Sequence, residues 1–286
     1  MFLSVLVNAY NRAYHLDRVL HAYRRQTHRD FEVVVADDGS TDGTREVAER
    51  HARESRFPVL FVTQPHEGHR RAAILNRGIL ACRAKVILFT DCDALPLGNL
   101  LETHVRLFAR RRMMIGGRVR LLPGETEKIT AVAAERGEYE SLLTPARRRR
   151  LLREHWKNVV QIAMRRRRRP HNLGLNFSIE AESLYSVNGY DENYRGWGNA
   201  DGDLRERLKK VGVRPRSIWT RAVVFHMHHE DDPTRKERRN VEYSRRAEIP
   251  VFCEKGLFRV PARAAVSSSG ASVPDAADVE EEVPLQ

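Results

Sequence analysis

The sequence predicts an α/β fold with an open sheet flanked by helices, and three observations carry this prediction. Apolar strand-like runs alternate with helical patterns up to about residue 122, which is typical of parallel strands joined by crossover helices. Each run ends in polar or acidic residues, as strands do at the ligand-binding edge of such a sheet. The 286 residues are 41% apolar, enough for the core of one large domain or two small ones.

Local patterns predict each element of this first half. Apolar runs between turn residues predict strands at Phe2–Asn8, Phe31–Asp37, Pro58–Gln64 and Lys85–Asp91. Apolar residues recur at helical spacing between these runs, at Leu16, Val19, Leu20 and Tyr23 and again at Ala72, Leu75 and Ile79. We interpret both sets as core-facing sides of helices.

The alternation stops near residue 123, and four regions are expected. They are an α/β half over 1–123, a basic helical insertion over 124–172, a second α/β half over 173–260 and a tail over 261–286. The insertion contains Arg147–Arg150 and Arg165–Arg169 on either side of the partly apolar Leu151–Met164. The second half should contain a strand at Leu173–Ile179, a helix from about Asn199 and a strand at Arg221–Phe225. The acidic tail has too little apolar content to fold, so we expect it to be disordered.

Composition excludes several classes of protein. The formal net charge is +12, from 50 basic and 38 acidic residues, and such a charge suits phosphates and anionic membrane surfaces. No apolar run approaches the roughly 20 residues of a bilayer-spanning helix, and Met1–Ser4 lacks the basic start of a signal peptide. We therefore expect a cytoplasmic protein, with peripheral contact at the inner face of the cell membrane as an option. Cys82, Cys92 and Cys253 have no paired spacing, which favours reduced thiols.

Asp91-Cys92-Asp93 follows an apolar strand and is the first candidate for chemistry. Residues two apart on a strand face the same way, so the two carboxylates are expected about 7 Å apart with a cation between them. Their oxygens suit Mg²⁺ or Mn²⁺. A glycosidase acid and base is the alternative, ranked lower because no apolar surroundings single out a protonated carboxyl. A plain turn before Pro96 would also explain the acids.

The stretch Val35–Thr44 is the second candidate, at the end of the second predicted strand. Ser40 or Thr41 can cap the helix that follows, which is the ordinary structural interpretation. Such a turn requires one acid, Asp37, and does not explain the second acid beside it, Asp38. Its carboxylate could accept the N–H of a uracil or the hydroxyls of a ribose.

Gly196-Trp197-Gly198 opens the third candidate, the segment Gly196–Leu204. Glycines on both sides of a Trp let the backbone approach a ligand while the ring offers a flat apolar face to a sugar. Asn199 can cap the next helix, which places Asp201 in its first turn. Asp203 is explained by the preference of acids for helix N-termini.

His226, His228 and His229 lie within four positions at the end of the last predicted strand, which raises the expectation of a metal contact. No second Cys/His cluster accompanies them, so a closed structural zinc site is not expected. The glycine motifs of Rossmann and P-loop proteins do not occur. A phosphate would then be held by a metal, with Arg70 or Arg71 assisting.

These motifs occur in the order of a known family. They are Ser4-Val5-Leu6-Val7-Asn8-Ala9-Tyr10-Asn11-Arg12, Asp37-Asp38-Gly39-Ser40, the segment Gly68–Gly78, Asp91-Cys92-Asp93, Gly189-Tyr190-Asp191 and Gly196–Leu204. With them the sequence resembles the family 2 nucleotide-sugar glycosyltransferases of GT-A fold, a Rossmann-like mixed sheet flanked by helices. The later motifs resemble the acceptor region of galactosyl- and N-acetylgalactosaminyltransferases.

The resemblance implies a role for each candidate. It implies that the donor is contacted by Tyr10, Asn11, Asp38, Arg71 and Asp91, and the acceptor by Gly196, Trp197 and Gly198. The implied metal ligands are Asp93, His229 and, more weakly, His226. Asp201 would be the catalytic base. The implied ligands are Mn²⁺ or Mg²⁺, a nucleotide sugar with UDP favoured, and a glycan or lipid-linked acceptor, as in cell-surface polysaccharide synthesis. A single in-line displacement assisted by Asp201 would invert the anomeric carbon.

Two departures from the family and two other functions accompany this interpretation. Asn8-Ala9 replaces the usual Pro-Thr, and Ala200 replaces a common Glu before the basic Asp, so an acceptor-binding carboxylate is missing. A protein that binds RNA or another polyanion through its arginine clusters is one alternative, although no nucleic-acid motif accompanies them. A catalytically silent binder of nucleotide sugar is the other.

Overall fold

Two sheets form the frame of the protein in this computed structural model, which describes residues 1–166, 174–230, 240–246 and 248–259. The larger sheet has the strand order β3-β2-β1-β4-β8-β6-β9. Its strands are β1 (Leu3–Ala9), β2 (Phe31–Asp37), β3 (Val59–Thr63), β4 (Val86–Asp91), β6 (Arg112–Ile115), β8 (Asn176–Glu180) and β9 (Arg214–Ser217). The first four strands are parallel, whereas β8 runs antiparallel to β4 and β6. The predicted mixed sheet is therefore confirmed.

The smaller sheet brings the middle and the end of the chain together. Its order is β5 (Ala94–Pro96), β10 (Val223–His226) and β7 (Gly117–Arg120). Strand β10 pairs antiparallel with β5, and His226 stands opposite Ala94. Because Ala94 directly follows Asp93, this pairing carries the histidines near residue 226 to the end of β4.

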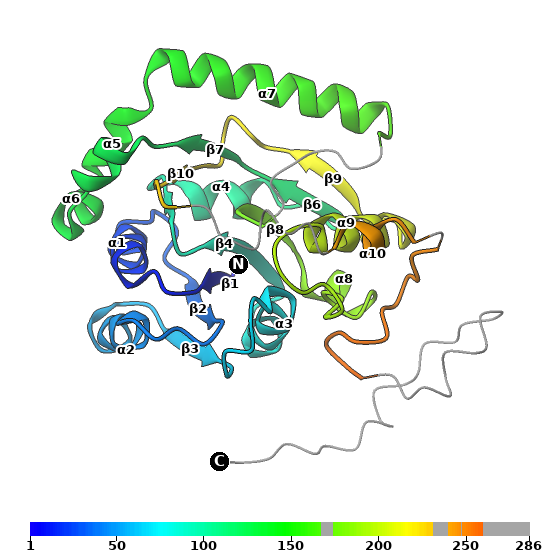
Figure 1. Ribbon diagram of the computed structural model, residues 1–286. Helices are drawn as coiled ribbons and strands as arrows, with labels where there is room; N and C mark the ends of the chain where they lie inside the picture. Colours follow the sequence, from blue (N-terminus) through cyan, green and yellow to red (C-terminus); the bar gives the residue numbers. More distant parts are fainter. Residues whose placement is uncertain (167–173, 231–239, 247, 260–286) are drawn as a thin grey trace.

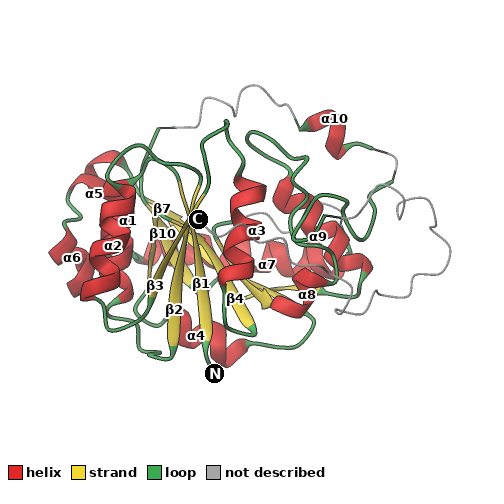
Figure 2. Ribbon diagram, turned by 90° about the horizontal axis from the view of Figure 1, so that it is seen from below, coloured by secondary structure: helices red, strands yellow, loops and turns green. Residues whose placement is uncertain are grey.

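Helices surround both sheets (Figures 1 and 2). They are α1 (Ala13–Tyr23), α2 (Thr44–Glu54), α3 (Arg71–Ala81), α4 (Leu100–Leu107), α5 (Pro123–Glu127), α6 (Ala131–Arg136), the 3-10 helix η1 (Glu138–Leu142), α7 (Pro145–Ala163), α8 (Ala181–Tyr185), α9 (Ala200–Lys210) and α10 (Val241–Ser244). Helices α1 and α2 pack against each other, while α3 packs on β1, β2 and β3. The predicted helical segment after residue 123 thus contains α5, α6, η1 and α7.

The core lies between these helices and the larger sheet. All seven apolar residues predicted to face it in the first two helical patterns are buried. Helix α3 packs especially closely, since a Cβ on Gly78 would lie 2.4 Å from Leu6 Cδ1. A side chain at position 78 would therefore push α3 away from β1.

Several expectations need correction. Neither Ser40 nor Thr41 caps α2, which begins at Thr44. The N-cap residue is Gly43, and Asp42 before it joins α2 to α1, because its Oδ1 accepts the Thr44 N–H at 3.0 Å and its Oδ2 accepts the Ala13 N–H at 2.9 Å. The strand expected from Leu173 begins at residue 176, and Leu173 lies outside the described residues. Short strands β5, β6, β7 and β9 have no counterpart in the prediction.

Three further expectations concern the cysteines, membrane-spanning helices and the C-terminal part of the chain. All three cysteines are free, as predicted. Within the described ranges, no helix has both the length and the apolar content needed to cross a bilayer. The expected disorder of the tail, and the last three arginines of Arg165–Arg169, lie outside the described residues.

Candidate active site

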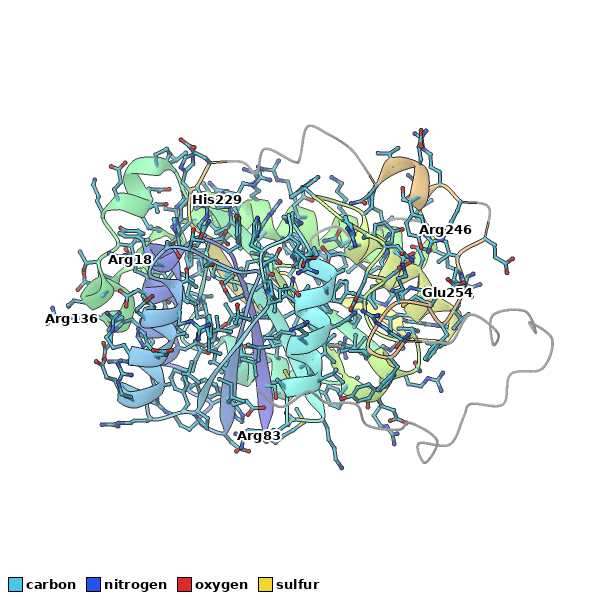
Figure 3. The ribbon with its side chains drawn as sticks, turned by 60° about the horizontal axis from the view of Figure 1, so that its bottom comes forward. Arg18, Arg83, Arg136, His229, Arg246 and Glu254 are labelled. Atoms are coloured by element: carbon cyan, nitrogen blue, oxygen red, sulfur yellow. The ribbon has the colours of Figure 1, made fainter. Side chains whose placement is uncertain are left out.

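The candidate residues gather at the carboxyl ends of the parallel strands. Strand β1 ends at Ala9, β2 ends at Asp37 and β4 ends at Asp91, and Tyr10 and Asp38 directly follow the first two. Figure 3 shows His229 at this end of the strands and Arg83, which precedes β4, at the opposite end. This is the edge at which open α/β sheets bind ligands.

Asp93, His226 and His229 form a compact cluster at this edge. The His229 Nε2 atom lies 3.0 Å from Asp93 Oδ2, and the His226 Nε2 atom lies 3.7 Å from Asp93 Oδ1. One ligand atom from each residue falls within 4.8 Å of the other two. Asp93 Oδ1 is buried and accepts no hydrogen bond from the residues that the structure describes. An orphaned buried carboxylate oxygen beside two imidazoles fits a divalent cation.

The surroundings prepare His229 for such a role. Its Nδ1 lies 2.7 Å from the Glu230 carbonyl oxygen and 3.2 Å from Arg12 Nη2, while its Nε2 faces Asp93 and would be the ligand atom for a metal. The hydrogen bond to Asp93 raises the pKa of His229, whereas burial lowers the pKa of His226. Burial alone would raise the pKa of Asp93, but the two histidines outweigh it and the pKa lies below its ordinary value.

A second cluster with similar spacing consists of Asp17, His21 and His51. Asp17 already has an ion pair with Arg50 and lies 3.1 Å from His51 Nε2. The His51 Nδ1 atom faces Arg24 at 3.3 Å, which makes Nδ1 the acceptor and Nε2 the protonated nitrogen. These contacts fit an ion-pair network between α1 and α2 better than a metal site.

Arg71 links two carboxylates that come from β4 and α9. Its guanidinium lies 3.3 Å from Asp91 Oδ1 and 3.2 Å from Asp201 Oδ1, and it also faces the Gly174 carbonyl oxygen at 3.4 Å. Burial raises the pKa of Asp91, and the Arg71 cation opposes this rise. Asp91 and Asp93 have different partners among the described residues, since Asp91 lies beside Arg71 and Asp93 lies beside His226 and His229. A cation shared by the two carboxylates stays a prediction.

Asp201 lies in the first turn of α9, as predicted. Its Oδ1 accepts hydrogen bonds from Arg71 at 3.2 Å and from the Tyr190 hydroxyl at 3.0 Å. Tyr190 is fully buried, and burial raises its pKa well above the ordinary value. Two donors therefore orient one oxygen of Asp201, while the other oxygen accepts no hydrogen bond from the described part of the chain.

Asp203 has a different role from the one expected. It is buried, its Oδ2 accepts from Arg207 Nε at 2.7 Å, and its Oδ1 accepts from Arg246 at 2.9 Å. Arg246 lies beside α10 in Figure 3, so this carboxylate ties α9 to the segment near residue 246. Compensation of the helix dipole is thus a minor part of its function, because it neutralises two arginines.

The Gly196-Trp197-Gly198 turn has the backbone that its sequence suggests. Gly196 and Gly198 have φ angles of 78° and 99°, a region that favours glycine. The Trp197 side chain is 47% exposed, so its ring is accessible to a ligand. Asn199 does not cap α9 through its side chain. It has a φ angle of 70°, and its amide faces the Asn240 carbonyl and the Ser244 hydroxyl.

Two acids, Asp37 and Asp38, have different contacts in the turn after β2. Asp37 holds the turn, since it accepts hydrogen bonds from Ser40 and from the Thr63 hydroxyl. Asp38 is buried and accepts hydrogen bonds from Gln64 and from the Arg70 N–H. Burial raises the pKa of Asp38. Both carboxylate oxygens of Asp38 bind residues that follow β3, and its contact with a uracil or ribose stays a prediction.

Tyr10 and Asn11 are the first residues after β1. The Tyr10 ring stacks on His66 with centroids 4.7 Å apart and planes at 11°. Asn11 has a φ angle of 45°, and its side-chain oxygen accepts the Thr41 N–H at 2.8 Å. Tyr10 thus lies beside Asp38, whose carbonyl faces His66 Nδ1 at 3.0 Å, and Asn11 fixes the loop that follows β2.

The structure also adds residues that sequence reasoning missed. Arg118 in β7 pairs with Val224, so its side chain lies on the same face as His226. Within the described ranges it has no hydrogen bond or ion pair, and burial lowers its pKa to about 10. Arg12 reaches His229 Nδ1 at 3.2 Å. The alternation of β7 was the one signal available for Arg118.

Comparison with known proteins matches this geometry. The model of the family "Glycosyl transferase family 2" matches residues 4–172, more than half of the chain. The chain belongs to glycosyl transferase family 2. A second model, described as the N-terminal domain of galactosyltransferase, matches residues 154–230. That range contains Tyr190, the Gly196–Leu204 segment and the histidines at the end of β10.

Two relatives illustrate the similarity in sequence. Validoxylamine A glucosyltransferase of Streptomyces hygroscopicus subsp. jinggangensis is 31% identical over 74% of the chain and 52% of that protein. Chondroitin synthase of Escherichia coli is 25% identical over 88% of the chain and 39% of that protein. The chain therefore spans about half or less of the length of these relatives.

Two solved structures illustrate the similarity in fold. A mannosyltransferase of Pyrobaculum calidifontis in complex with GDP-Man and Mn²⁺ has a TM-score of 0.53 at 20% identity, over 78% of this chain and 56% of that one. TarS of S. aureus, residues 1–349, in complex with UDP-GlcNAc has a TM-score of 0.55 at 16% identity, over 82% and 61%. At these identities the likeness supports the GT-A fold.

Proposed function

We propose that the protein is an inverting hexosyltransferase that moves a sugar from a nucleoside-diphosphate sugar to a hydroxyl of a glycan or lipid-linked acceptor. The observation that carries the proposal is the convergence of two groups at one sheet edge. One is the cluster of Asp93, His226 and His229, and the other is Asp201 with its partner Arg71. A metal site beside a positioned carboxylate suits sugar transfer from a diphosphate.

Asp93, His226 and His229 would hold the metal. The metal would be the partner that Asp93 Oδ1 lacks among the described residues. The mixed oxygen and nitrogen donors suit Mn²⁺ and also accept Mg²⁺. When bound, the cation would neutralise charge developing on the departing diphosphate. Arg12 lies behind His229 and adds positive charge at the same edge.

Donor binding involves the first half of the chain. Asp38 would accept the uracil N–H, with the Tyr10 ring packed near the base and Asp91 at the ribose. Asn11 would act by fixing the loop. Arg71 and Arg118 approach the metal cluster from α3 and β7, so both would contact the diphosphate or another anionic group of the substrate. UDP is the favoured nucleotide because of the galactosyltransferase-like region.

Asp201 would act as the general base. It would take the proton of the acceptor hydroxyl while that oxygen bonds to the anomeric carbon and the bond from this carbon to the diphosphate oxygen breaks. The oxygen of Asp201 that accepts no hydrogen bond from described residues is available for that proton. Arg71 and Tyr190 fix the orientation of the carboxylate. Trp197 with its two glycines would hold the sugar of the acceptor.

A thermal-shift screen tests the proposal without knowledge of the acceptor. UDP, GDP and dTDP are each added with Mn²⁺, with Mg²⁺ and with EDTA. A ligand at about 100 times its dissociation constant should stabilise the fold by about 2.7 kcal/mol, so a clear rise in Tm with UDP and Mn²⁺ is expected. Equal shifts with EDTA would contradict a metal-assisted donor site.

A catalytically silent binder is the second candidate, because Ala200 stands where the family resemblance implies a Glu. Donor hydrolysis separates the two functions, since even without acceptor an active transferase releases UDP slowly. Release of UDP from UDP-sugars in the presence of Mn²⁺ supports the enzyme. Tight UDP binding with no release in the presence of candidate glycans supports the silent binder.

A further inference from the structure

Helix α7 has one face against the molecule and one face toward solvent. Leu151 and Asn158 are buried on the inner face, and the His155 ring contacts the Ser217 hydroxyl of β9 at 2.9 Å. The helix also packs on β7. Figure 1 shows it running along the edge of the molecule over β7 and β9, with no described element on its outer side.

The outer face carries a row of large apolar side chains. Leu152, Trp156, Val160 and Met164 follow one another at intervals of four residues, so the first three share one side of the helix and Met164 extends the row just past its end. Their exposed fractions are 48%, 59%, 53% and 58%. Single exposed apolar residues are ordinary, but a contiguous row marks an interaction surface. We call these four residues the α7 stripe.

Basic residues surround the α7 stripe. Those exposed on or directly after the helix are Arg148, Arg149, Arg150, Arg153, Lys157, Arg165 and Arg166. The acid within this stretch, Glu154, lies 3.6 Å from Lys157. A row of Trp and aliphatic residues bordered by Arg and Lys is typical of helices that lie in the interface of an anionic membrane.

The charges also discriminate between occupants of this face. A second copy of the chain would bring the same basic residues against each other, which like charges oppose. An anionic lipid surface instead pairs with the bases, each contributing attraction near the surface. The face has both an apolar row for the acyl boundary and cations for the headgroups, which a purely electrostatic RNA-binding surface would not require.

We propose that the outer face of α7 binds anionic membrane, with the α7 stripe inserted at the headgroup boundary. This inference goes beyond sugar transfer, because it holds whatever the donor or acceptor is. It also relates to the candidate site through β7. Arg118 and Arg120 lie on the strand beneath α7 and on the face of His226, so a membrane-bound phosphate compound would meet basic residues between the helix and the metal cluster.

Co-sedimentation of the full chain with vesicles tests the proposal. One set contains phosphatidylserine and phosphatidylcholine, and the other contains phosphatidylcholine alone. We expect binding to the first set. The double variant Leu152→Ser/Trp156→Ser should lower the partition coefficient by about tenfold or more, because it removes inserted apolar surface. Leu80→Ser is the matched control, since Leu80 is 51% exposed on α3.

A charge variant and a fluorescence measurement complete the test. Arg149→Gln/Arg153→Gln/Lys157→Gln should weaken binding much more than the equal charge change Arg53→Gln/Arg56→Gln/Arg106→Gln at exposed positions elsewhere. Phosphatidylserine vesicles should shift the tryptophan emission of the unmodified chain to shorter wavelength. That shift should disappear in Trp156→Phe, because Trp156 is the inserted ring.

The outcomes separate the occupants of the face. Binding to phosphatidylserine vesicles that the stripe variant loses and the Leu80 control retains supports the proposal. No vesicle binding overturns it, and so does binding that the stripe variant leaves intact, which would be electrostatic adsorption. A dimer in solution that becomes a monomer in Leu152→Ser/Trp156→Ser would assign the face to a second copy, and preferred binding to RNA would assign it to nucleic acid.

Discussion

One oxygen of Asp201 is held by Arg71 and Tyr190, which leaves the other oxygen for the acceptor proton in the proposed reaction. Replacement by Asn keeps the shape and an oxygen for the two donors but cannot accept a proton. Asp201→Asn should therefore lower turnover by about 10²–10⁴-fold while UDP and metal affinity stay nearly normal. Steady-state rates and UDP titrations measure both quantities.

Glu182→Gln is the matched control for Asp201→Asn, because Glu182 also lies in the first turn of a helix. It should leave turnover within about twofold, as expected for an exposed surface position. Equal losses in the two variants would show that first-turn charge, rather than proton transfer, matters.

Metal binding at Asp93, His226 and His229 should depend on pH. Ligation needs both imidazoles neutral, and the hydrogen bond to Asp93 raises the pKa of His229 above its ordinary value. Mn²⁺ affinity should thus be full near pH 8 and fall by about tenfold or more toward pH 5.5. Calorimetric titration with Mn²⁺ at several pH values measures this affinity. An affinity that stayed constant over this pH range would contradict the prediction.

Without metal, the effect of pH at this cluster has the opposite direction, because it acts on folding stability. A raised histidine pKa means that the His229–Asp93 pair stabilises the fold below about pH 6.5, and that this contribution is lost as pH rises through the folded-state pKa. Melting temperatures in EDTA should therefore show a gain from His229 at pH 6 that His229→Gln removes. An equal effect of His229→Gln at pH 6 and pH 8.5 would show that the pair is not charged in the folded protein.

Arg118 is the residue-scale prediction that depends most on the structure. A half-buried cation without a partner in the described residues should bind an anionic part of the substrate. Arg118→Gln should weaken UDP binding or raise the KM of the acceptor by about tenfold, the value of one charge-assisted hydrogen bond. Arg112→Gln, an exposed arginine of β6, is the control. A normal affinity for both substrates would assign Arg118 no binding role.

At the scale of elements, α9 depends on a buried ion pair. The side chains of Arg207 and Asp203 are 0% and 1% exposed, and Arg246 binds the same carboxylate. Asp203→Ala leaves a buried guanidinium without its partner, so the free energy of unfolding should fall by about 3–5 kcal/mol. Urea unfolding measures this free energy. We expect the variant to be impaired in stability and not in one particular catalytic step.

Glu49→Ala gives the comparison for Asp203→Ala. Glu49 has a 3.8 Å ion pair with Arg45 on the surface of α2, and such pairs contribute about 0–1 kcal/mol. If both variants lost the same small amount of stability, the ion pair within α9 would be no stronger than a surface contact.

The elements differ in how well the sequence predicts them, for physical reasons. Strand β2 coincides with its predicted range, because a fully buried strand needs a continuous apolar run. Strand β9 has the sequence Arg-Pro-Arg-Ser at the edge of the sheet, where a proline is tolerated and burial is slight. Its pairing with β6 depends on neighbours far away in sequence, so no local pattern predicts it.

At the scale of the whole molecule, the candidate site is partly readable from sequence. Asp38, Asp91 and Asp93 follow apolar strands, and the order of the strands brings them to one edge. Tyr190 is part of the motif Gly189-Tyr190-Asp191 but its contact with Asp201 has no local signal, and Arg118 has no motif at all. Their contacts arise because the loop before α9 folds over α3 and because β7 joins β10 in a second sheet.

The central claim is that a divalent cation at Asp93, His226 and His229 holds the diphosphate of the donor, and calorimetric titration of UDP with Mn²⁺ or with EDTA tests it most directly. Asp17→Asn is the matched control, because Asp17 belongs to the other Asp/His/His cluster. We predict Mn²⁺-dependent UDP binding in the unmodified chain and in Asp17→Asn, and its loss in Asp93→Asn with the melting temperature nearly unchanged. Equal UDP affinity with Mn²⁺ and with EDTA, or unchanged Mn²⁺-dependent binding in Asp93→Asn, would contradict the account.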